Sequence, residues 1–535
     1  MLKWLQRALK PGEQAEILVV CAAEPIAQGA EAAGYRVTRL PDAAALTDHK
    51  SLAACVIFAS GDEQADLDAA RKMAASWKAS EHQIILAVAA ETQAVLTAIQ
   101  DLDSETGDSV RVRPLSASQR MARRLLLDHP FGRLSYDGQS PQPAIFGTGA
   151  EAEQVLLQLF RMMHLPGVKP RATIVGRDAQ AWLDGLLSSL PALAQIGALA
   201  AVENWDGAAS AIYVADAGAW NAAKRPDWFV PVYWLPSAGP APAGTIAVPQ
   251  TDWREAVAAL FSDPADLQAQ AIHELYLEER RQAGDTIGIR PSMQPWDALP
   301  ERFRAASRHQ ADHIACKLAA ISCHIVPVNG GPRFSFTTEE REALAEMEHQ
   351  RWAAVQMLDG WRYGEARDDA AKLTPLLVPY ESLTPEIRDL DRLSVRAIPA
   401  QLDRVKQTIL RDLTLALHAE GTPESGFDAG FSHLLDELAK RYPERAIVLR
   451  TALASPVQQR ATEIALSKAR LSVTIQPGET LPPEAIALAG KAETVLVSSA
   501  ATADFVIQIG SAASQSAART IELDLNGALR RAPWQ

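Results

Sequence analysis

Short apolar runs alternate with alanine-rich stretches along the first part of the chain. Most of these stretches are long enough for a helix, so the alternation predicts parallel strands joined by crossover helices in a doubly wound sheet. The turn after the first run, residues 22–25, contains no glycine. We therefore expect a degenerate Rossmann-like domain over residues 1–135 that holds no dinucleotide. Its expected strands are 17–21, 35–38, 54–59, 84–88 and 110–112.

A second α/β unit is expected over residues 140–260, and its first turn is rich in glycine. A strand at 143–146 leads into Gly147-Thr148-Gly149, with an alanine three residues later and then a helical stretch. In this pattern the glycines let the backbone approach a phosphate, and the anion rests on the helix N-terminus. The second strand begins about 25 residues after the glycines, as the motif requires. The later strands are expected at 211–216, 229–233 and 245–248.

The end of the second strand departs from the usual NAD pattern. Gly176 stands where an acidic residue normally binds the ribose, and Arg177 and Asp178 follow it. Arg177 could face a phosphate, Asp178 could take the ribose role, or the crevice could be empty. A nucleotide or dinucleotide is the cofactor class that fits, and its identity stays unknown. The two units resemble the TrkA-N regulatory domains of potassium channels and transporters, which implies ligand-driven conformational change without chemistry.

The most specific pattern lies in residues 335–410. An E-H-x-x-W helix is followed by G-W-x-Y-G, R-D-D and Pro-Tyr segments. The pattern resembles the ryanodine-receptor (RyR) domain, a small helical module, and so implies ligand or partner binding without catalysis. Aromatic rings beside fixed polar groups suit a purine-like ligand, although the same rings could simply fill a small core. The expected ligand-binding residues are Glu348, His349, Trp352, Trp361, Tyr363, Arg367, Asp368, Asp369 and Tyr380.

Residues 262–330 are expected to form a helical connector, and residues 425–535 an α/β tail. In the connector His309 and His313 have a chelating spacing, but no third ligand is placed by the sequence, so surface histidines are expected and no metal site. The tail faintly resembles the SLOG group of Rossmann-like nucleotide-sensing domains at residues 451–455 and 475–478. It lacks the P-G-G-x-G-T motif of that group, so a purely structural sheet is the alternative. Its expected strands are 446–449, 471–475, 495–497 and 505–507.

Composition excludes several classes of function. A net charge of −13 gives no basic footprint for nucleic acid. No run of eighteen apolar residues predicts a membrane span, and the basic amphipathic residues 1–10 favour a short terminal helix. Four cysteines with no zinc or disulfide spacing fit a reducing cytoplasm.

These features favour a cytosolic sensor or regulatory protein over an enzyme, since no catalytic triad, P-loop lysine or metal cluster emerges. The expected partners are a small nucleotide-like ligand, a protein effector or transporter, and further copies of the chain. The resemblances imply, by analogy, bacterial stress or anti-phage signalling. The alternatives are an accessory subunit of a potassium channel or transporter, and an NAD-dependent enzyme that uses the crevice at Gly147 and Gly149.

Overall fold

A computed structural model gives the protein two compact units. The first comprises Met1–Arg124, Glu153–Leu157 and Pro249–Asp312, and the second the rest of the chain. The terminal stretch 1–10 and the first turn at 21–23 lie outside the described residues. The structure describes residues 16–20, 24–48, 53–77, 84–107, 109–129, 141–165, 167–205, 209–223, 230–327, 334–468, 471–475, 485, 488, 493–494, 503–509 and 519–532.

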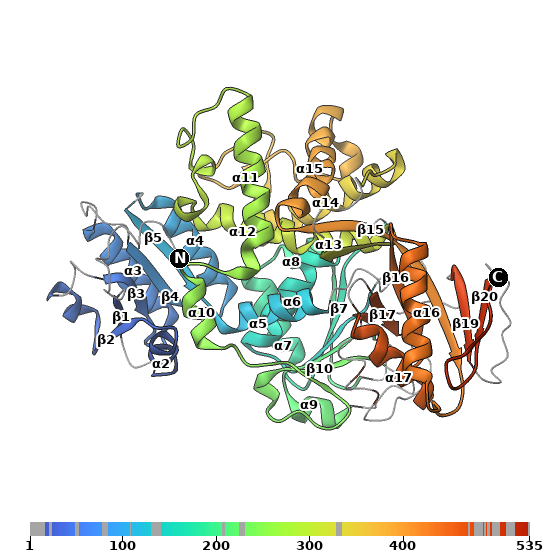
Figure 1. Cartoon of the computed structure of the whole chain (residues 1–535). Coiled ribbons are helices and arrows are strands. Elements are labelled where there is room, and N and C mark those ends of the chain that lie inside the picture. Colours follow the sequence, from blue (N-terminus) through green and yellow to red (C-terminus); the bar gives the residue numbers. More distant parts are fainter. Residues whose placement is uncertain are drawn as a thin grey trace. The chain divides into compact units, whose positions relative to one another are not determined.

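The first unit contains a parallel five-stranded sheet in the order β2-β1-β3-β4-β5 (Figure 1). Successive residues of a strand face opposite sides, so Leu18 and Ile17 enter two different apolar cores. Both faces of the sheet are therefore covered, and the doubly wound α/β class is confirmed. Its strands are β1 (Glu16–Val20), β2 (Arg36–Leu40), β3 (Ala53–Phe58), β4 (Ile84–Ala89) and β5 (Val110–Leu115), and its helices are α2 (Glu24–Ala32), α3 (Glu63–Ser76), α4 (Gln93–Glu105) and α5 (Ala117–Asp128).

A distant part of the chain completes this unit. Helix α10 (Trp253–Ala259) packs against α2, and a Cβ on Gly29 would lie only 2.6 Å from the Cβ of Trp253. Glycine therefore allows the close approach of the two helices. Helices α11 (Leu267–Gln282) and α12 (Glu301–Asp312) follow and pack against each other. Most of the expected connector is thus helical.

The second unit begins with a parallel six-stranded sheet in the order β11-β10-β9-β6-β7-β8. Numbered from its own first strand, this is the 3-2-1-4-5-6 order of dinucleotide-binding folds. The switch point lies between β6 and β9, the first and fourth strands. Strand β8 was not expected from the sequence. The strands are β6 (Ala144–Phe146), β7 (Arg171–Val175), β8 (Ala198–Val202), β9 (Ile212–Val214), β10 (Val232–Trp234) and β11 (Ile246–Ala247), with helices α6 (Ala150–Met162), α7 (Ala179–Ser189), α8 (Leu193–Ile196) and α9 (Ala217–Ala222).

A helical module follows in the same unit. Helix α14 (Thr338–Leu358) begins at a capping box in which Thr337 and Glu340 each bond the other's backbone N–H. It packs against α15 (Pro385–Arg404), which begins with a proline at a position that needs no N–H donor. Between them β13 (Arg362–Tyr363) pairs with β14 (Leu373–Thr374). The module is mostly helical, as expected.

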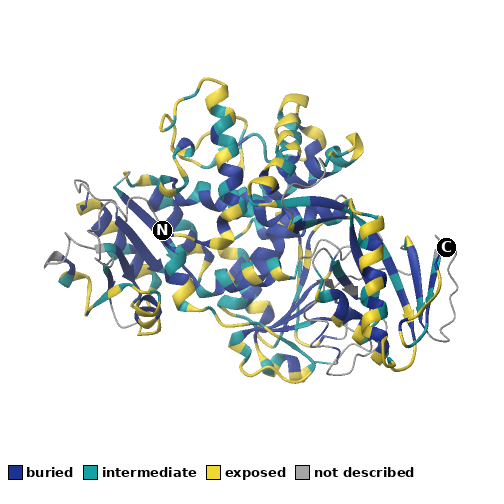
Figure 2. Ribbon diagram, viewed as in Figure 1, coloured by how far each residue is buried: buried dark blue, intermediate teal, exposed yellow. Residues whose placement is uncertain are grey.

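The tail forms a third sheet around β15 (Gln407–Ala419). Strand β12 (Cys323–Pro327), at the end of the expected connector, pairs antiparallel with the start of β15; neither strand was expected. The buried strands of the sheets stand out in Figure 2. The expected strand at 495–497 lies outside the described residues. The remaining elements are β16 (Arg445–Thr451), β17 (Leu471–Ile475), β18 (Glu493–Thr494), β19 (Phe505–Ile509), β20 (Arg519–Leu523), β21 (Leu529–Arg531), α16 (Phe427–Arg441) and α17 (Pro456–Leu466).

Of the helices in the described ranges, none is both long and apolar enough to cross a bilayer.

Candidate functional site

The glycine turn after β6 lies at the switch point of the six-stranded sheet. Gly147 has a φ of +97°, and a Cβ there would lie 2.5 Å from the Cβ of Asp216. The Gly147 N–H donates to the Val175 carbonyl at 2.9 Å, so the turn is tied to the neighbouring strand. Position 147 therefore requires glycine, both because of its backbone conformation and because the residues after β9 approach closely.

Gly149 differs from Gly147 because the space beside it is open. It has a φ of +105°, caps the N-terminus of α6, and has no atom within 4 Å of the position that a Cβ would take. Thr148 between the two glycines is partly buried, whereas Gly149 is exposed. The first N–H groups of α6 have no partners within the helix and can therefore serve an anion that approaches over Gly149.

Two carboxylates flank this turn. Asp216, two residues after the end of β9, accepts a hydrogen bond from the Gly218 N–H through Oδ1 at 2.8 Å. Its Oδ2 makes no hydrogen bond to any described residue. Glu151, in the first turn of α6, accepts from the Ser237 N–H at 2.9 Å. A ligand with hydroxyl donors beside a phosphate, as in a nucleotide, fits this arrangement better than a bare phosphate does.

The residues that follow β7 are exposed. Gly176 has a φ of +152°, and its N–H donates to the Val202 carbonyl at 2.9 Å. Arg177 and Asp178 come next, and the Asp178 side chain, which precedes α7, accepts no hydrogen bond from the helix N-terminus. Both side chains are therefore accessible. Which of them contacts a ligand stays a prediction.

In the helical module, Glu348 is a buried ionic residue. Its carboxylate accepts from Lys317 Nζ at 2.5 Å, and from Arg351 Nε at 3.1 Å and Nη2 at 2.7 Å. Burial alone would raise the pKa of Glu348, but the Arg351 and Lys317 charges hold that pKa well below its usual value. Both oxygens of Glu348 are thus engaged within the protein. This geometry gives Glu348 a structural role, and its role toward a ligand stays a prediction.

His349 lies at the centre of an aromatic cluster. Its ring is stacked on Trp352 with centroids 5.7 Å apart, and the ring of Tyr380 lies 6.0 Å away. Its Nε2 is 2.8 Å from the Val378 carbonyl, and its Nδ1 is 3.5 Å from an Asp391 carboxylate oxygen. Burial opposes protonation, but these acceptors raise the pKa of His349. His349 and Tyr380 are buried, whereas Trp352 is only partly covered.

Three of the other residues expected in this site, Trp361, Arg367 and Asp369, form a second group. The Arg367 guanidinium lies 5.1 Å from the Trp361 ring centroid and donates to Asp369 at 2.7 Å. Asp368 accepts from the Ala370 and Ala371 N–H groups and so shapes the loop, while Tyr363 is 58% exposed. No ring contact among residues 334–468 joins this group to the His349 cluster. The structure thus brings six of the expected residues together in two groups, His349 with Trp352 and Tyr380, and Arg367 with Trp361 and Asp369.

A comparison with protein families identifies this module. A family model described as the RyR domain matches residues 336–408. The chain therefore contains an RyR domain. The match covers α14, β13, β14, α15 and the first residues of β15, and so includes every residue expected to bind ligand in this region.

Several partners of the RyR residues could not be found from the sequence. Arg351 follows Glu348 by three residues on the same helix, a spacing that could have signalled their pairing. Lys317 and Asp391 come from other helices, and no local pattern points to them.

Asp216, at the glycine turn, could not be found from the sequence either. It follows a strand that becomes the neighbour of this turn only through the strand order of the sheet.

The histidine pair of the connector differs from the sequence prediction of surface histidines. His313 is fully buried, with Nε2 3.1 Å from the Met162 carbonyl, so the prediction was wrong for this residue. Burial lowers the pKa of His313 and keeps the ring neutral. Over the part of the chain that the structure describes, no group of three or more His, Cys, Asp or Glu side chains is arranged to hold a metal ion.

Proposed function

We propose that this protein is a ligand-responsive regulator that binds a nucleotide-type ligand at the glycine turn between β6 and α6. The observation that carries the proposal is the open space beside Gly149, at the N-terminus of a helix that begins at the switch point of a 3-2-1-4-5-6 sheet. Ligands of open parallel sheets bind at this place because the loops on either side of the switch point diverge.

Each part of a nucleotide has a counterpart at this turn. A phosphate approaches the exposed backbone of Gly149 and receives hydrogen bonds from the first N–H groups of α6. Asp216 Oδ2 then accepts a hydrogen bond from a ribose hydroxyl. Arg177, which follows Gly176 in place of the usual acidic residue, favours an additional phosphate over the plain ribose of NAD. We therefore propose a mononucleotide or phosphorylated ligand in preference to NAD.

The RyR domain provides a second binding surface in this proposal. The partly covered face of Trp352, held by the stack on His349, suits the flat ring of a purine-like ligand. The Trp361 and Arg367 pair offers another accessible ring with a cation beside it. Binding at either surface is proposed on these contacts and on the RyR match.

A regulatory role fits these features better than catalysis does. Neither candidate surface combines a nucleophile with a neighbouring general base among the described residues. Among the described residues the cysteines Cys55, Cys316 and Cys323 are buried and form no disulfide, which supports a cytosolic location. We keep bacterial stress or anti-phage signalling as the proposed context, by analogy with the RyR and SLOG-like resemblances.

The runner-up is an accessory subunit of a potassium channel or transporter. This alternative was suggested by the expected tandem of two similar sheets. The argument for it is weaker because the strand order is 2-1-3-4-5 in the first unit and 3-2-1-4-5-6 in the second. The tail sheet has β15 at its centre between β16 and β19. We keep the SLOG-like character of this tail as a proposal.

Native mass spectrometry of the freshly purified protein tests the proposal. A copurifying nucleotide that is lost in the Gly149→Val variant would support binding at the turn. Gly34→Val is the matched control, since Gly34 also has a positive φ, of +91°, and open space beside it. A protein that carries no nucleotide and binds none on titration would contradict the proposal.

A further inference from the structure

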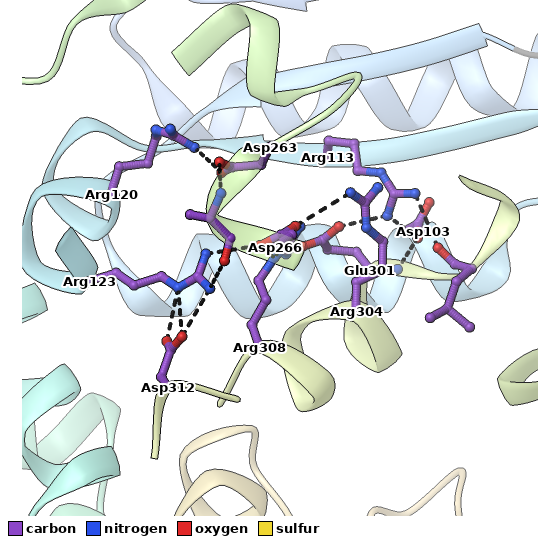
Figure 3. Close-up of polar contacts among 12 residues, drawn as sticks. Asp103, Arg113, Arg120, Arg123, Asp263, Asp266, Glu301, Arg304, Arg308 and Asp312 are labelled. Atoms are coloured by element: carbon purple, nitrogen blue, oxygen red, sulfur yellow. Dashed lines mark hydrogen bonds and ion pairs between the residues drawn. The ribbon is translucent and has the colours of Figure 1, made fainter. Parts of the chain in front are cut away.

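Ten charged side chains gather in the first unit, five arginines and five carboxylates (Figure 3). They come from α4, β5, α5, the short helix η4 (Pro264–Asp266) and α12. Contacts between them connect the sheet to the helices that follow residue 260. The group consists of Arg113, Arg120, Arg123, Arg304, Arg308, Asp103, Asp263, Asp266, Glu301 and Asp312.

Four of the arginines have close carboxylate partners. Arg120 lies 2.7 Å from an oxygen of Asp263, and Arg123 lies 2.9 Å from an oxygen of Asp312. Arg113 and Arg308 are the other two, with oxygens of Glu301 at 2.6 Å and Asp266 at 2.8 Å. Arg304 is the fifth arginine of the group.

The other three carboxylates of the group are Glu301, Asp266 and Asp103. Each has an arginine other than Arg304 as its nearest cation. Glu301 accepts from Arg113 at 2.6 Å and also from Arg308. Asp266 accepts from Arg308 at 2.9 Å and from Arg123 at 3.0 Å. Asp103 is 3.6 Å from Arg113, and burial raises the pKa of Asp103. The carboxylate oxygens nearest to Arg304 are therefore already engaged.

Arg304 is the cation without a close partner. It is 4% exposed, and its nearest carboxylate oxygen, on Asp266, is 3.8 Å away. Within the described ranges its Nε has no hydrogen-bond partner. Burial, followed by the charges of Arg113 and Arg308, lowers the pKa of Arg304 to about 9. Buried polar groups without partners are rare in folded proteins, and an unpaired buried charge is costly.

An accessible aromatic ring lies next to this cation. The Arg304 guanidinium is 4.9 Å from the centroid of Trp296, and that of Arg308 is 6.0 Å from it. Trp296 is partly exposed and lies in the segment between α11 and α12. The neighbouring Asp297 makes no ion pair with Arg304 among the described residues. The Arg304 guanidinium thus lies beside a ring that solvent reaches, and its Nε has no hydrogen-bond partner within the described ranges.

We propose that Arg304 and Trp296 form a binding site for the oxyanionic group of a small ligand, a phosphate or a carboxylate. The planar guanidinium donates two parallel hydrogen bonds to either group, and the anion supplies a closer negative charge than the Asp266 oxygen 3.8 Å away. This site is separate from the glycine turn between β6 and α6, and its existence does not depend on ligand binding there.

Isothermal titration of the full chain with inorganic phosphate and with succinate tests the site and distinguishes the two chemistries. Sodium chloride at matched ionic strength controls for screening. We expect the wild type to bind one of the two probes and Arg304→Met to bind it at least about tenfold more weakly. Arg120→Met, in the same cluster, should retain that binding.

Stability without any probe separates a ligand-binding cation from a structural one. Arg304→Met removes a buried charge whose nearest carboxylate oxygen is 3.8 Å away and already bonded to Arg308, so its melting temperature should equal or exceed that of the wild type. Arg308→Met breaks hydrogen bonds to Asp266 and Glu301 and should melt at a lower temperature. Arg304→Lys keeps the charge without the planar fork and should show intermediate binding.

Three results would overturn the proposal. The first is that the wild type binds neither phosphate nor succinate, even if it binds an acidic peptide, which would indicate a protein partner instead. The second is equal binding by the wild type and folded Arg304→Met or Arg304→Lys. The third is a loss of stability in Arg304→Met as large as that in Arg308→Met, which would make Arg304 a structural member of the cluster.

Discussion

Gly147 and Asp216 lie so close together that a single added Cβ would be 2.5 Å from the Cβ of Asp216. Two neighbouring parallel strands, β6 and β9, end here, and Asp216 also donates its N–H to the Phe146 carbonyl at 3.0 Å. The glycine turn and the carboxylate of Asp216 are thus held in fixed register.

The first prediction concerns this contact. Gly147→Ala should destabilise the protein by about 1–3 kcal/mol, because the new methyl group overlaps Asp216 and the backbone has a positive φ. Gly185→Ala is the control, since Gly185 lies within helix α7 and has open space beside it. Alanine there should stabilise slightly. Urea denaturation of both variants provides the comparison, and equal stabilities would contradict the close approach.

The second prediction concerns the aromatic surfaces of the RyR domain. Replacing Trp352 or Trp361 with alanine should weaken nucleotide binding by about 1–3 kcal/mol, the range for stacking of a base on an aromatic ring. Calorimetric titration with adenine and guanine nucleotides, on variants shown to be folded, measures this loss. Unchanged binding by both variants would assign the rings to core packing alone.

The third prediction concerns the buried ion pairs of Glu348. Glu348→Gln leaves the charges of Lys317 and Arg351 without compensation and should cost about 3–5 kcal/mol of unfolding free energy. Glu437→Gln removes one partner of an exposed pair with Lys440 and should change stability little. Chemical denaturation of the two variants checks the difference, which should vanish if Glu348 is solvated in the folded protein.

The fourth prediction concerns the pH dependence that His349 confers. Its folded-state pKa is raised above 6.5 by Asp391 and the Val378 carbonyl, so its protonated form stabilises the fold. This contribution is complete below pH 6.5 and is lost as pH rises through the raised pKa. The stability advantage of the wild type over His349→Gln should therefore decrease from acidic to alkaline pH. Denaturation of both proteins across this range tests the sign, and an advantage that grows with pH would contradict it.

Local sequence patterns predicted the strands that are short and continuously apolar. The run at 54–59 is buried on both faces in β3, and the run at 84–88 in β4, so nearly every position had to be apolar. Strand β15 was missed because its burial alternates and charged residues such as Arg411 and Asp412 interrupt it. Strand β8 was missed because it is alanine-rich and only partly buried.

The candidate site residues also differ in whether the sequence alone could reveal them, because some act through local backbone and others through distant contacts. Gly147 and Gly149 could be identified because their roles depend on the backbone of a single turn. Asp216 and Lys317 act through contacts with residues more than thirty positions away, so only the tertiary structure reveals them. The separation of the RyR residues into a His349 group and a Trp361 group is likewise set by the fold of the loop after α14.

The ligand preference at the glycine turn gives a fifth prediction. If Arg177 faces a phosphate, mononucleotides should raise the melting temperature more than NAD does at equal concentration. Arg177→Ala should reduce that difference. Greater stabilisation by NAD would contradict the preference, and turnover of NADH with any substrate would contradict the regulatory role itself.

Nucleotide-dependent thermal stabilisation of three proteins, the wild type, Gly149→Val and Gly34→Val, tests the central claim most directly. Both variants place a branched side chain at a positive φ with open space beside it, so neither side chain meets a neighbouring atom. We predict that nucleotide raises the melting temperature of the wild type and of Gly34→Val in a concentration-dependent way, and leaves Gly149→Val unchanged. An equal shift in all three proteins, or no shift in the wild type, would contradict binding at the glycine turn.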